Sequence, residues 1–210
     1  MSNKKVSYSL YLVSDKKSCK NRDLEELIQQ AILGGVTIVQ LREKNIDSKD
    51  FYEQALRVKR VTDKYNIPLI INDRVDIALA VGADGVHVGQ EDLSCSVIKR
   101  NISKNLIVGV SVHNVEEAMR AELDGADYIG CGAVFNTSTK ENTKKLKIEE
   151  LIKIKENVKI PVVAIGGINE ENIEELYDSN IDGIAVVSAI LSKENCEEAS
   201  RILKEKIKNL

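Results

Sequence analysis

The stretch GADGVHVG at residues 82–89 recurs as GADYIGCG at residues 125–132 and, more loosely, as NIDGIAVV at residues 180–187. Each copy begins with a residue that commonly ends a helix, continues through a tight turn and finishes in a strand-like run. The repeat therefore predicts one recurring unit, in which a helix leads into the next strand of a parallel sheet.

Short apolar runs of this kind are spaced along the whole chain. Most are nearly continuous in apolar residues rather than alternating, which is typical of parallel strands covered on both faces. The predicted strands are residues 9–13, 37–41, 69–71, 85–88, 107–110, 128–131, 162–165 and 184–187.

The segments between the predicted strands have the apolar spacing of helices. We expect Asn21 to cap the first helix, Asn114 the helix before the second copy of the repeat, and Ser192 the last helix. No linker divides the chain, so residues 1–210 are predicted to form one domain. The predicted fold is a closed (β/α)8 TIM barrel with eight parallel strands, and the alternative is an open, doubly wound sheet.

Charge and composition exclude several classes of protein. The 30 lysine and arginine residues are outnumbered by 33 aspartate and glutamate residues, so the chain has no overall basic field for a nucleic acid. Aromatic residues make up only 4% of the chain and tryptophan is absent, so stacking platforms for single strands are scarce. No apolar run approaches the roughly 20 residues of a membrane-spanning helix. We therefore expect neither a nucleic acid nor a membrane as partner.

The cysteines and the N-terminal sequence favour a cytoplasmic protein. Cys19, Cys95, Cys131 and Cys196 form no C-x-x-C pair, so their spacing does not indicate a zinc site. With no recognisable secretion signal, free thiols in a reducing cytoplasm are expected. The sequence leaves the oligomeric state open, with a homo-oligomer as one option.

Polar residues gather directly after the predicted strands, at the carboxyl ends where barrels of this type place their active sites. Gln40, Arg42 and Lys44 alternate along the chain and therefore share one face of a strand. Two cations directed into the barrel mouth favour a bound phosphate or diphosphate. The alternative is that both cations pair with inward carboxylates or simply frame the rim.

Two carboxylates follow neighbouring predicted strands. Asp73 and Asp92 beside a diphosphate would be suitable ligands for Mg²⁺, which prefers oxygen atoms and keeps several waters. We expect one such ion per subunit. The alternative for each residue is an ordinary loop carboxylate, and Asp73 in particular is placed to cap the helix that follows it.

A second anion site is indicated farther along the chain. The loop at residues 137–140, Thr-Ser-Thr-Lys, offers three hydroxyls and a cation, although a solvated loop is the alternative. Gly166, Gly167 and Ser188 follow the last two predicted strands, where barrels often bind phosphate. A helix that starts near Asn169 would add its positive end to this site.

The two histidines have no metal-ligand spacing. His87 lies within a predicted strand, which favours a satisfied residue of the core or barrel interior, and His113 lies after a strand, facing the rim.

Together these motifs resemble the thiamine phosphate synthase family, and the resemblance extends over essentially the whole chain. The family's fold is the barrel expected from the strand pattern. The resemblance rests on YLVSD at residues 11–15, QLREK at 40–44, ND at 72–73, GVHVGQED at 85–92, GVS at 109–111, the loop at 137–140, AIGGI at 164–168 and VS at 187–188.

The resemblance implies two substrate subsites and one metal site. Mg²⁺ would be held by Asp73 and Asp92, and the catalytic residues would be Arg42, Lys44, Ser111 and Lys140. The pyrimidine diphosphate would be bound by Gln40, Arg42, Glu43, Lys44, Asn72, Ser111 and Lys140. The thiazole phosphate would be bound by Thr137, Ser138, Thr139, Gly166, Gly167, Val187 and Ser188.

The implied activity is that of a transferase. It condenses 4-amino-2-methyl-5-(diphosphooxymethyl)pyrimidine with a thiazole ethyl phosphate, carboxylated or not, and yields thiamine phosphate and diphosphate. The diphosphate leaves first, and the thiazole nitrogen then attacks the resulting pyrimidine carbocation. Such a reaction depends on stabilising the leaving group more than on a side-chain nucleophile, in agreement with the cations and hydroxyls at the rim.

The residues leave other functions open. A thiazole tautomerase-like relative would need no diphosphate or metal site, so the retained cations and carboxylates argue against it. A barrel enzyme acting on a sugar phosphate would share only the glycine pair, and a non-catalytic sensor of thiamine precursors would keep the pockets without turnover. The family pattern has proline where Ala133 and Asn136 stand, so we expect weaker binding of the thiazole phosphate.

Overall fold

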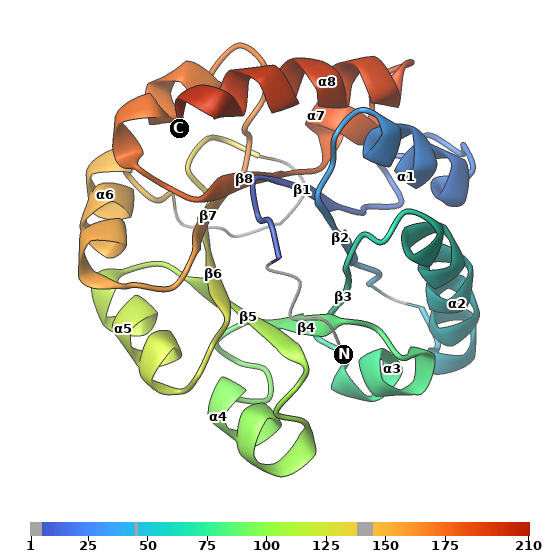
Figure 1. Cartoon of the computed structure of the whole chain (residues 1–210), viewed down its shortest axis with the longest axis horizontal. Coiled ribbons are helices and arrows are strands. Elements are labelled where there is room, and N and C mark those ends of the chain that lie inside the picture. Colours follow the sequence, from blue (N-terminus) through green and yellow to red (C-terminus); the bar gives the residue numbers. More distant parts are fainter. Residues whose placement is uncertain (1–5, 45, 138–144) are drawn as a thin grey trace.

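The strands close into a parallel barrel in which each strand pairs with its neighbours in chain order and β8 pairs with β1 (Figure 1). The computed structural model describes residues 6–44, 46–137 and 145–210. The closed barrel confirms the predicted fold and excludes the open sheet. The strands are β1 (Leu10–Val13), β2 (Ile38–Leu41), β3 (Leu69–Asn72), β4 (Gly85–Val88), β5 (Ile107–Val112), β6 (Tyr128–Gly132), β7 (Val162–Ile165) and β8 (Gly183–Val186).

Helices surround the barrel on its outside (Figure 1). No helix in the described part of the chain combines the length and the apolar character needed to cross a membrane. The helices are α1 (Leu24–Leu33), α2 (Ser48–Lys64), α3 (Val75–Val81), α4 (Cys95–Val97) with the π-helix η1 (Ile98–Ile102), α5 (Val115–Leu123), α6 (Ile148–Asn157), the 3-10 helix η2 (Ile173–Ser179), α7 (Ser188–Leu191), α8 (Cys196–Lys206) and the 3-10 helix η3 (Ile207–Asn209).

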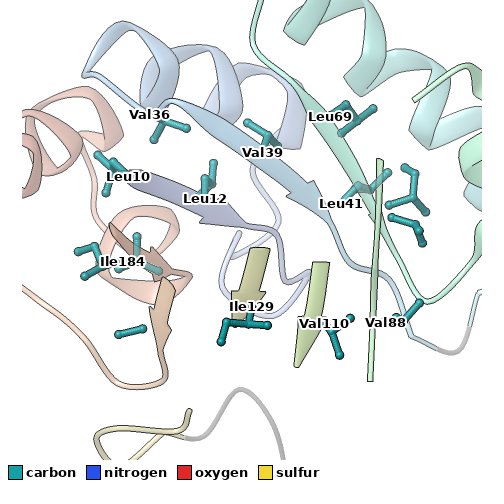
Figure 2. Close-up of a cluster of buried hydrophobic side chains, with 14 of the residues drawn as sticks. Leu10, Leu12, Val36, Val39, Leu41, Leu69, Val88, Val110, Ile129 and Ile184 are labelled. Carbon is teal, nitrogen blue, oxygen red and sulfur yellow. The ribbon is translucent and has the colours of Figure 1, made fainter. Parts of the chain in front are cut away.

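The two faces of the strands build two different cores. Outward side chains such as Leu10, Leu12 and Val39 pack between the barrel and the helices (Figure 2). Inward side chains such as Tyr11 and Tyr128 fill a smaller cluster inside the barrel. Because successive side chains of a strand point to opposite faces, one strand can contribute to both cores, as β1 does with Leu12 outside and Tyr11 inside. The inner cluster forms the floor beneath the carboxyl ends of the strands.

The repeated sequence unit links neighbouring strands by hydrogen bonds at their amino ends. The aspartate of each copy accepts a hydrogen bond from a backbone N–H of the preceding strand. The three bonds are Leu69 N to Asp84 Oδ2 (2.9 Å), Val108 N to Asp127 Oδ2 (2.6 Å) and Val162 N to Asp182 Oδ2 (2.7 Å). These aspartates thereby tie neighbouring strands together at the end of the barrel opposite the predicted site.

One of the three predicted helix caps is confirmed. Asn114 Oδ1 accepts from the backbone N–H of Glu117 at 2.8 Å and begins α5. The other two predictions are wrong, because a closer polar residue takes the role. Asp23 caps α1, while Asn21 lies in a left-handed turn with φ of 61°. Asn195 caps α8, while Ser192 ends α7.

Candidate active site

The carboxyl ends of the strands open into a cavity of about 720 Å³. This volume lies within the range of about 300–1,000 Å³ that is usual for small-molecule sites. Residues from every part of the chain converge there, as the sequence pattern predicts. The predicted site residues that line the cavity are Gln40, Arg42, Lys44, Asn72, Asp73, Asp92, Ser111, Thr137, Gly166, Gly167, Val187 and Ser188.

Of the predicted site residues that the structure describes, only Glu43 does not line the cavity. Ser138, Thr139 and Lys140 lie outside the described residues. Glu43 follows β2 between the two inward cations, and its carboxylate accepts a hydrogen bond from Gln54 on α2 at 3.2 Å. Burial raises the pKa of Glu43. Its side chain therefore contacts the helix layer, as the alternation along this segment requires.

Both cations of the β2 segment face a carboxylate in this structure. Arg42 Nη1 lies 3.7 Å from Asp15 Oδ1, and Lys44 Nζ donates to Asp73 Oδ2. This is the pairing that the sequence left as the alternative to a bound anion. The Lys44 pair is partly exposed to solvent at the cavity wall, and such pairs contribute only about 0–1 kcal/mol. A polyphosphate can therefore compete for the cation at small cost.

The carboxylate of Asp73 is directed away from a capping role. Asp73 has φ of 60°, and its backbone N–H donates to the carbonyl oxygen of His87 at 2.8 Å. Arg74 is the residue at the N-cap of α3, and no side chain makes a capping hydrogen bond there. Capping therefore does not explain Asp73. An aspartate tolerates the left-handed conformation better than most residues, which fits its place at this sharp bend.

Asp92 shares the cavity with Asp73 and has a local role as well. Its Oδ2 atom accepts from the backbone N–H of Gly89 at 2.7 Å and so closes the turn after β4. Within residues 6–44, 46–137 and 145–210, no group of three or more His, Cys, Asp or Glu side chains is arranged to hold a metal. Two carboxylates fit Mg²⁺ only if waters and substrate phosphates complete its octahedral shell.

The opposite side of the cavity has exposed backbone rather than charge. Gly166 and Gly167 have φ of 103° and 69°, a region that residues with side chains rarely adopt. A Cβ atom on Gly167 would lie 2.4 Å from the carbonyl oxygen of Asn136, and one on Gly166 would lie 2.5 Å from the Cβ of Ala133. The loop after β6 thus packs directly on the glycine pair and brings Thr137 to the cavity.

The helix expected near Asn169 begins later than predicted. Asn169 donates its backbone N–H to Asn172 Oδ1 at 2.9 Å, and the 3-10 helix η2 begins only at Ile173. The element that begins at the cavity is α7, which starts at Ser188 immediately after Val187. A short helix after β8 beside a glycine loop after β7 is the usual phosphate site of these barrels.

A chain of hydrogen bonds crosses the floor of the cavity, and the sequence pattern did not reveal it. Gln40 Nε2 donates to the Tyr11 hydroxyl at 2.9 Å, and that hydroxyl lies 2.7 Å from the Tyr128 hydroxyl. His87 Nδ1 lies 2.9 Å from the Tyr128 hydroxyl, and His87 Nε2 lies 2.9 Å from Ser111 Oγ. Burial raises the pKa of both phenols, so each keeps its proton.

The second histidine and the cysteines agree with their predicted positions. His113 lines the cavity rim, with Nδ1 3.0 Å from Glu117 Oε2. Cys19, Cys95, Cys131 and Cys196 are buried and free of disulfides. Burial raises the pKa of the Cys95 thiol to about 11 and that of Cys131 to about 12, so neither is a reactive thiolate at neutral pH.

Comparison with known proteins gives the family. The model of a family described as thiamine monophosphate synthase matches residues 10–190. The chain belongs to this family. A thiamine-phosphate synthase from Clostridium tetani is 54% identical over 98% of this chain and 100% of its own length. One from Alkaliphilus oremlandii is 56% identical over 98% of this chain and 99% of its own length.

A solved structure of the thiamine monophosphate synthase family has the same architecture. Thiamine phosphate pyrophosphorylase from Pyrococcus furiosus superposes with a TM-score of 0.87 at 42% identity and covers 95% of both chains. Membership of this family confirms the resemblance that was inferred from the motifs. The relatives named thiamine-phosphate synthase are transferases. The family assignment thus agrees with a cavity that presents cations and carboxylates on one side and a glycine pair on the other.

Proposed function

We propose that this chain is a thiamine-phosphate synthase. It joins 4-amino-2-methyl-5-(diphosphooxymethyl)pyrimidine to a thiazole ethyl phosphate and releases diphosphate. The observation that carries the proposal is that one cavity is lined both by two cations, Arg42 and Lys44, and by the backbone of Gly167 beside Ser188, two groups that we assign to two separate anions. One substrate with a diphosphate and another with a phosphate match this arrangement.

The cations act on the leaving group. The bond between the pyrimidine methylene carbon and the diphosphate oxygen breaks, and its electron pair leaves with the diphosphate. Arg42 and Lys44 stabilise the charge that develops there, and Lys140 is proposed to join them. The thiazole nitrogen then donates its lone pair to the methylene carbon and forms the new C–N bond. No side-chain nucleophile and no proton transfer are needed for this balance.

The carboxylates are proposed to hold Mg²⁺ against the diphosphate. Asp73 and Asp92 would supply two oxygen ligands, and the bound ion would neutralise part of the leaving group's charge. Because Asp73 is paired with Lys44, substrate binding must exchange this internal ion pair for two new contacts. Lys44 would then be free to hold the diphosphate, and Asp73 would be free to hold the ion.

The remaining proposed contacts orient the two rings. Gln40, Asn72 and Ser111 face the pyrimidine, whereas Thr137 and Val187 help to hold the thiazole phosphate, together with Ser138, Thr139 and Gly166. These contacts hold both reactants in a geometry suited to attack, which contributes to the rate by proximity.

The buried free thiols fit a reducing compartment such as the cytoplasm.

The proposal is tested by chromatographic detection of thiamine phosphate. Purified protein is incubated with Mg²⁺ and both substrates, and each component is omitted in turn. We expect product only in the complete mixture. Binding of the thiazole phosphate without any product would instead support a tautomerase-like or sensor protein on the same barrel.

A further inference from the structure

The hydrogen-bond chain beneath the cavity links two residues that are proposed to face the pyrimidine. It runs from Gln40 through Tyr11, Tyr128 and His87 to Ser111, with donor–acceptor distances of 2.7–2.9 Å. Each member comes from a different strand, in the order β2, β1, β6, β4 and β5. The two phenols in the middle of the chain are 1% and 0% exposed, so their mutual hydrogen bond is shielded from water.

Two glycines at inward positions of the barrel leave room for the rings of this hydrogen-bond chain. A Cβ atom on Gly109 would lie 2.1 Å from the Tyr128 ring and 2.5 Å from His87 Nδ1. A Cβ atom on Gly130 would lie 3.1 Å from the His87 ring. Two inward positions on neighbouring strands are therefore empty where the rings of Tyr128 and His87 meet. Any larger residue at Gly109 would displace the rings that carry the chain.

The chain has a direction, because each phenol carries a single proton. The Gln40 amide donates to the Tyr11 hydroxyl, and the buried Tyr11 proton needs an acceptor of its own, so we assign Tyr11 as the donor to Tyr128. In the same order we assign Tyr128 as the donor to His87 Nδ1, and the imidazole proton of that tautomer is on Nε2, directed at Ser111 Oγ. This order leaves the carbonyl oxygen of Gln40 as an acceptor and the hydroxyl proton of Ser111 as a donor, both at residues that line the cavity.

We propose that Tyr11, Tyr128 and His87 are positioning residues that fix Gln40 as an acceptor and Ser111 as a donor. The inference rests on the proposed function. An aminopyrimidine matches this polarity, because its amine donates and its ring nitrogens accept. An oxo-pyrimidine in its lactam form presents the reverse, a carbonyl acceptor beside a ring N–H donor. The chain thereby selects the amino ring over the oxo ring, and a mismatch leaves buried polar groups unpaired.

Removing one hydroxyl from the middle of the chain tests this inference. In Tyr128→Phe and, separately, Tyr11→Phe, we expect the KM and Kd of the pyrimidine diphosphate to rise roughly tenfold, as for one lost buried hydrogen bond. The KM of the thiazole phosphate should stay the same. The preference for the 4-amino over the 4-oxo substrate, measured as a ratio of kcat/KM, should fall by about tenfold or more.

Tyr8→Phe is the matched control. The Tyr8 ring stacks on Tyr128 with centroids 4.7 Å apart, and it belongs to the same inner cluster. No hydrogen bond of its hydroxyl to another described residue is present, so its removal should leave both KM values and the amino preference unchanged. If Tyr8→Phe reproduced the effect of Tyr128→Phe, packing rather than hydrogen-bond polarity would be responsible and the inference would fail.

The imidazole gives a readout that does not require turnover. The protein has only two histidines, so ¹⁵N NMR signals of the ring nitrogens are simple to assign with a His113→Gln variant. We expect the Nε2–H tautomer for His87 in the wild type and a shifted Nδ1 signal in Tyr128→Phe. An Nδ1–H tautomer in the wild type, or an unchanged amino preference in both phenylalanine variants, would overturn the inference. A wild-type protein that makes no thiamine phosphate would instead overturn the proposed function.

Discussion

Lys44 Nζ donates a hydrogen bond to Asp73 Oδ2 across the carboxyl ends of β2 and β3. The ammonium is the group proposed to hold the diphosphate, and the carboxylate is one of the two proposed for Mg²⁺. In this structure each therefore satisfies the other. A substrate that carries both a diphosphate and a bound cation replaces this pair with two stronger contacts, so binding of the diphosphate and of Mg²⁺ should be mutually favourable.

The metal role of Asp92 is separable from its role in the turn. Asp92→Asn keeps an oxygen that can accept from Gly89 N–H but removes the negative charge. We expect the Mg²⁺ concentration for half-maximal rate to rise about tenfold or more, with folding intact. Initial rates over a Mg²⁺ titration measure this. An unchanged midpoint would contradict the proposed metal role.

The leaving-group role of Arg42 predicts a loss in kcat. Arg42→Ala removes a cation from the diphosphate side of the cavity, and loss of one such group typically costs about 100- to 1,000-fold in kcat. Steady-state kinetics with both substrates saturating check this. Arg57→Ala is the control, because Arg57 lies on α2 and pairs with Glu25 at the surface. Wild-type turnover in Arg42→Ala would refute the assignment.

The glycine pair predicts a selective defect in thiazole phosphate binding. In Gly167→Ala the new Cβ would meet the Asn136 carbonyl oxygen, at a φ of 69° that alanine rarely adopts. We expect the KM for the thiazole phosphate to rise about tenfold or more while that for the pyrimidine diphosphate stays constant. Gly82→Ala is a matched control, since its φ is 64° but no atom lies within 4 Å of the new Cβ. An equal rise in KM for both substrates would contradict the proposed division of the cavity.

The repeated aspartates predict a stability effect away from the site. Asp127→Ala leaves the buried N–H of Val108 without its acceptor and should reduce the free energy of unfolding by about 1–3 kcal/mol. Urea denaturation measures the change. Asp63→Ala removes an exposed partner of Lys59 within α2 and should cost less than about 1 kcal/mol. An equal decrease in the free energy of unfolding in the two variants would show that the strand contact of Asp127 contributes no more stability than an exposed ion pair.

The sequence predicted the barrel well because its signal is repeated. All eight predicted strands overlap the observed ones, since buried parallel strands require continuous apolar runs. The wrong helix caps have a local cause. Asn21 and Ser192 are both good capping residues by type, and only the backbone path decides that Asp23 and Asn195 take the role instead. Cap identity is therefore less predictable than strand position.

The sequence predicted the charged residues of the site, which follow apolar strands, but it did not predict the buried hydroxyl groups within those strands. Arg42 and Asp73 stand out because cations and carboxylates rarely follow apolar strands without a reason. Tyr11 and Tyr128 lie inside apolar runs and resemble ordinary core residues in sequence. Their hydroxyls become informative only when the closed barrel brings β1 and β6 to the same interior. The pairing of Lys44 with Asp73 likewise depends on register between neighbouring strands.

The most direct measurement is the ratio of diphosphate to thiamine phosphate released by the purified protein. Both products are quantified in the same reaction, with and without a metal chelator. If one cavity binds both substrates for a single transfer, the two products form in equal amounts and the chelator abolishes both. Diphosphate released without thiamine phosphate, or neither product in the complete mixture, would contradict the account.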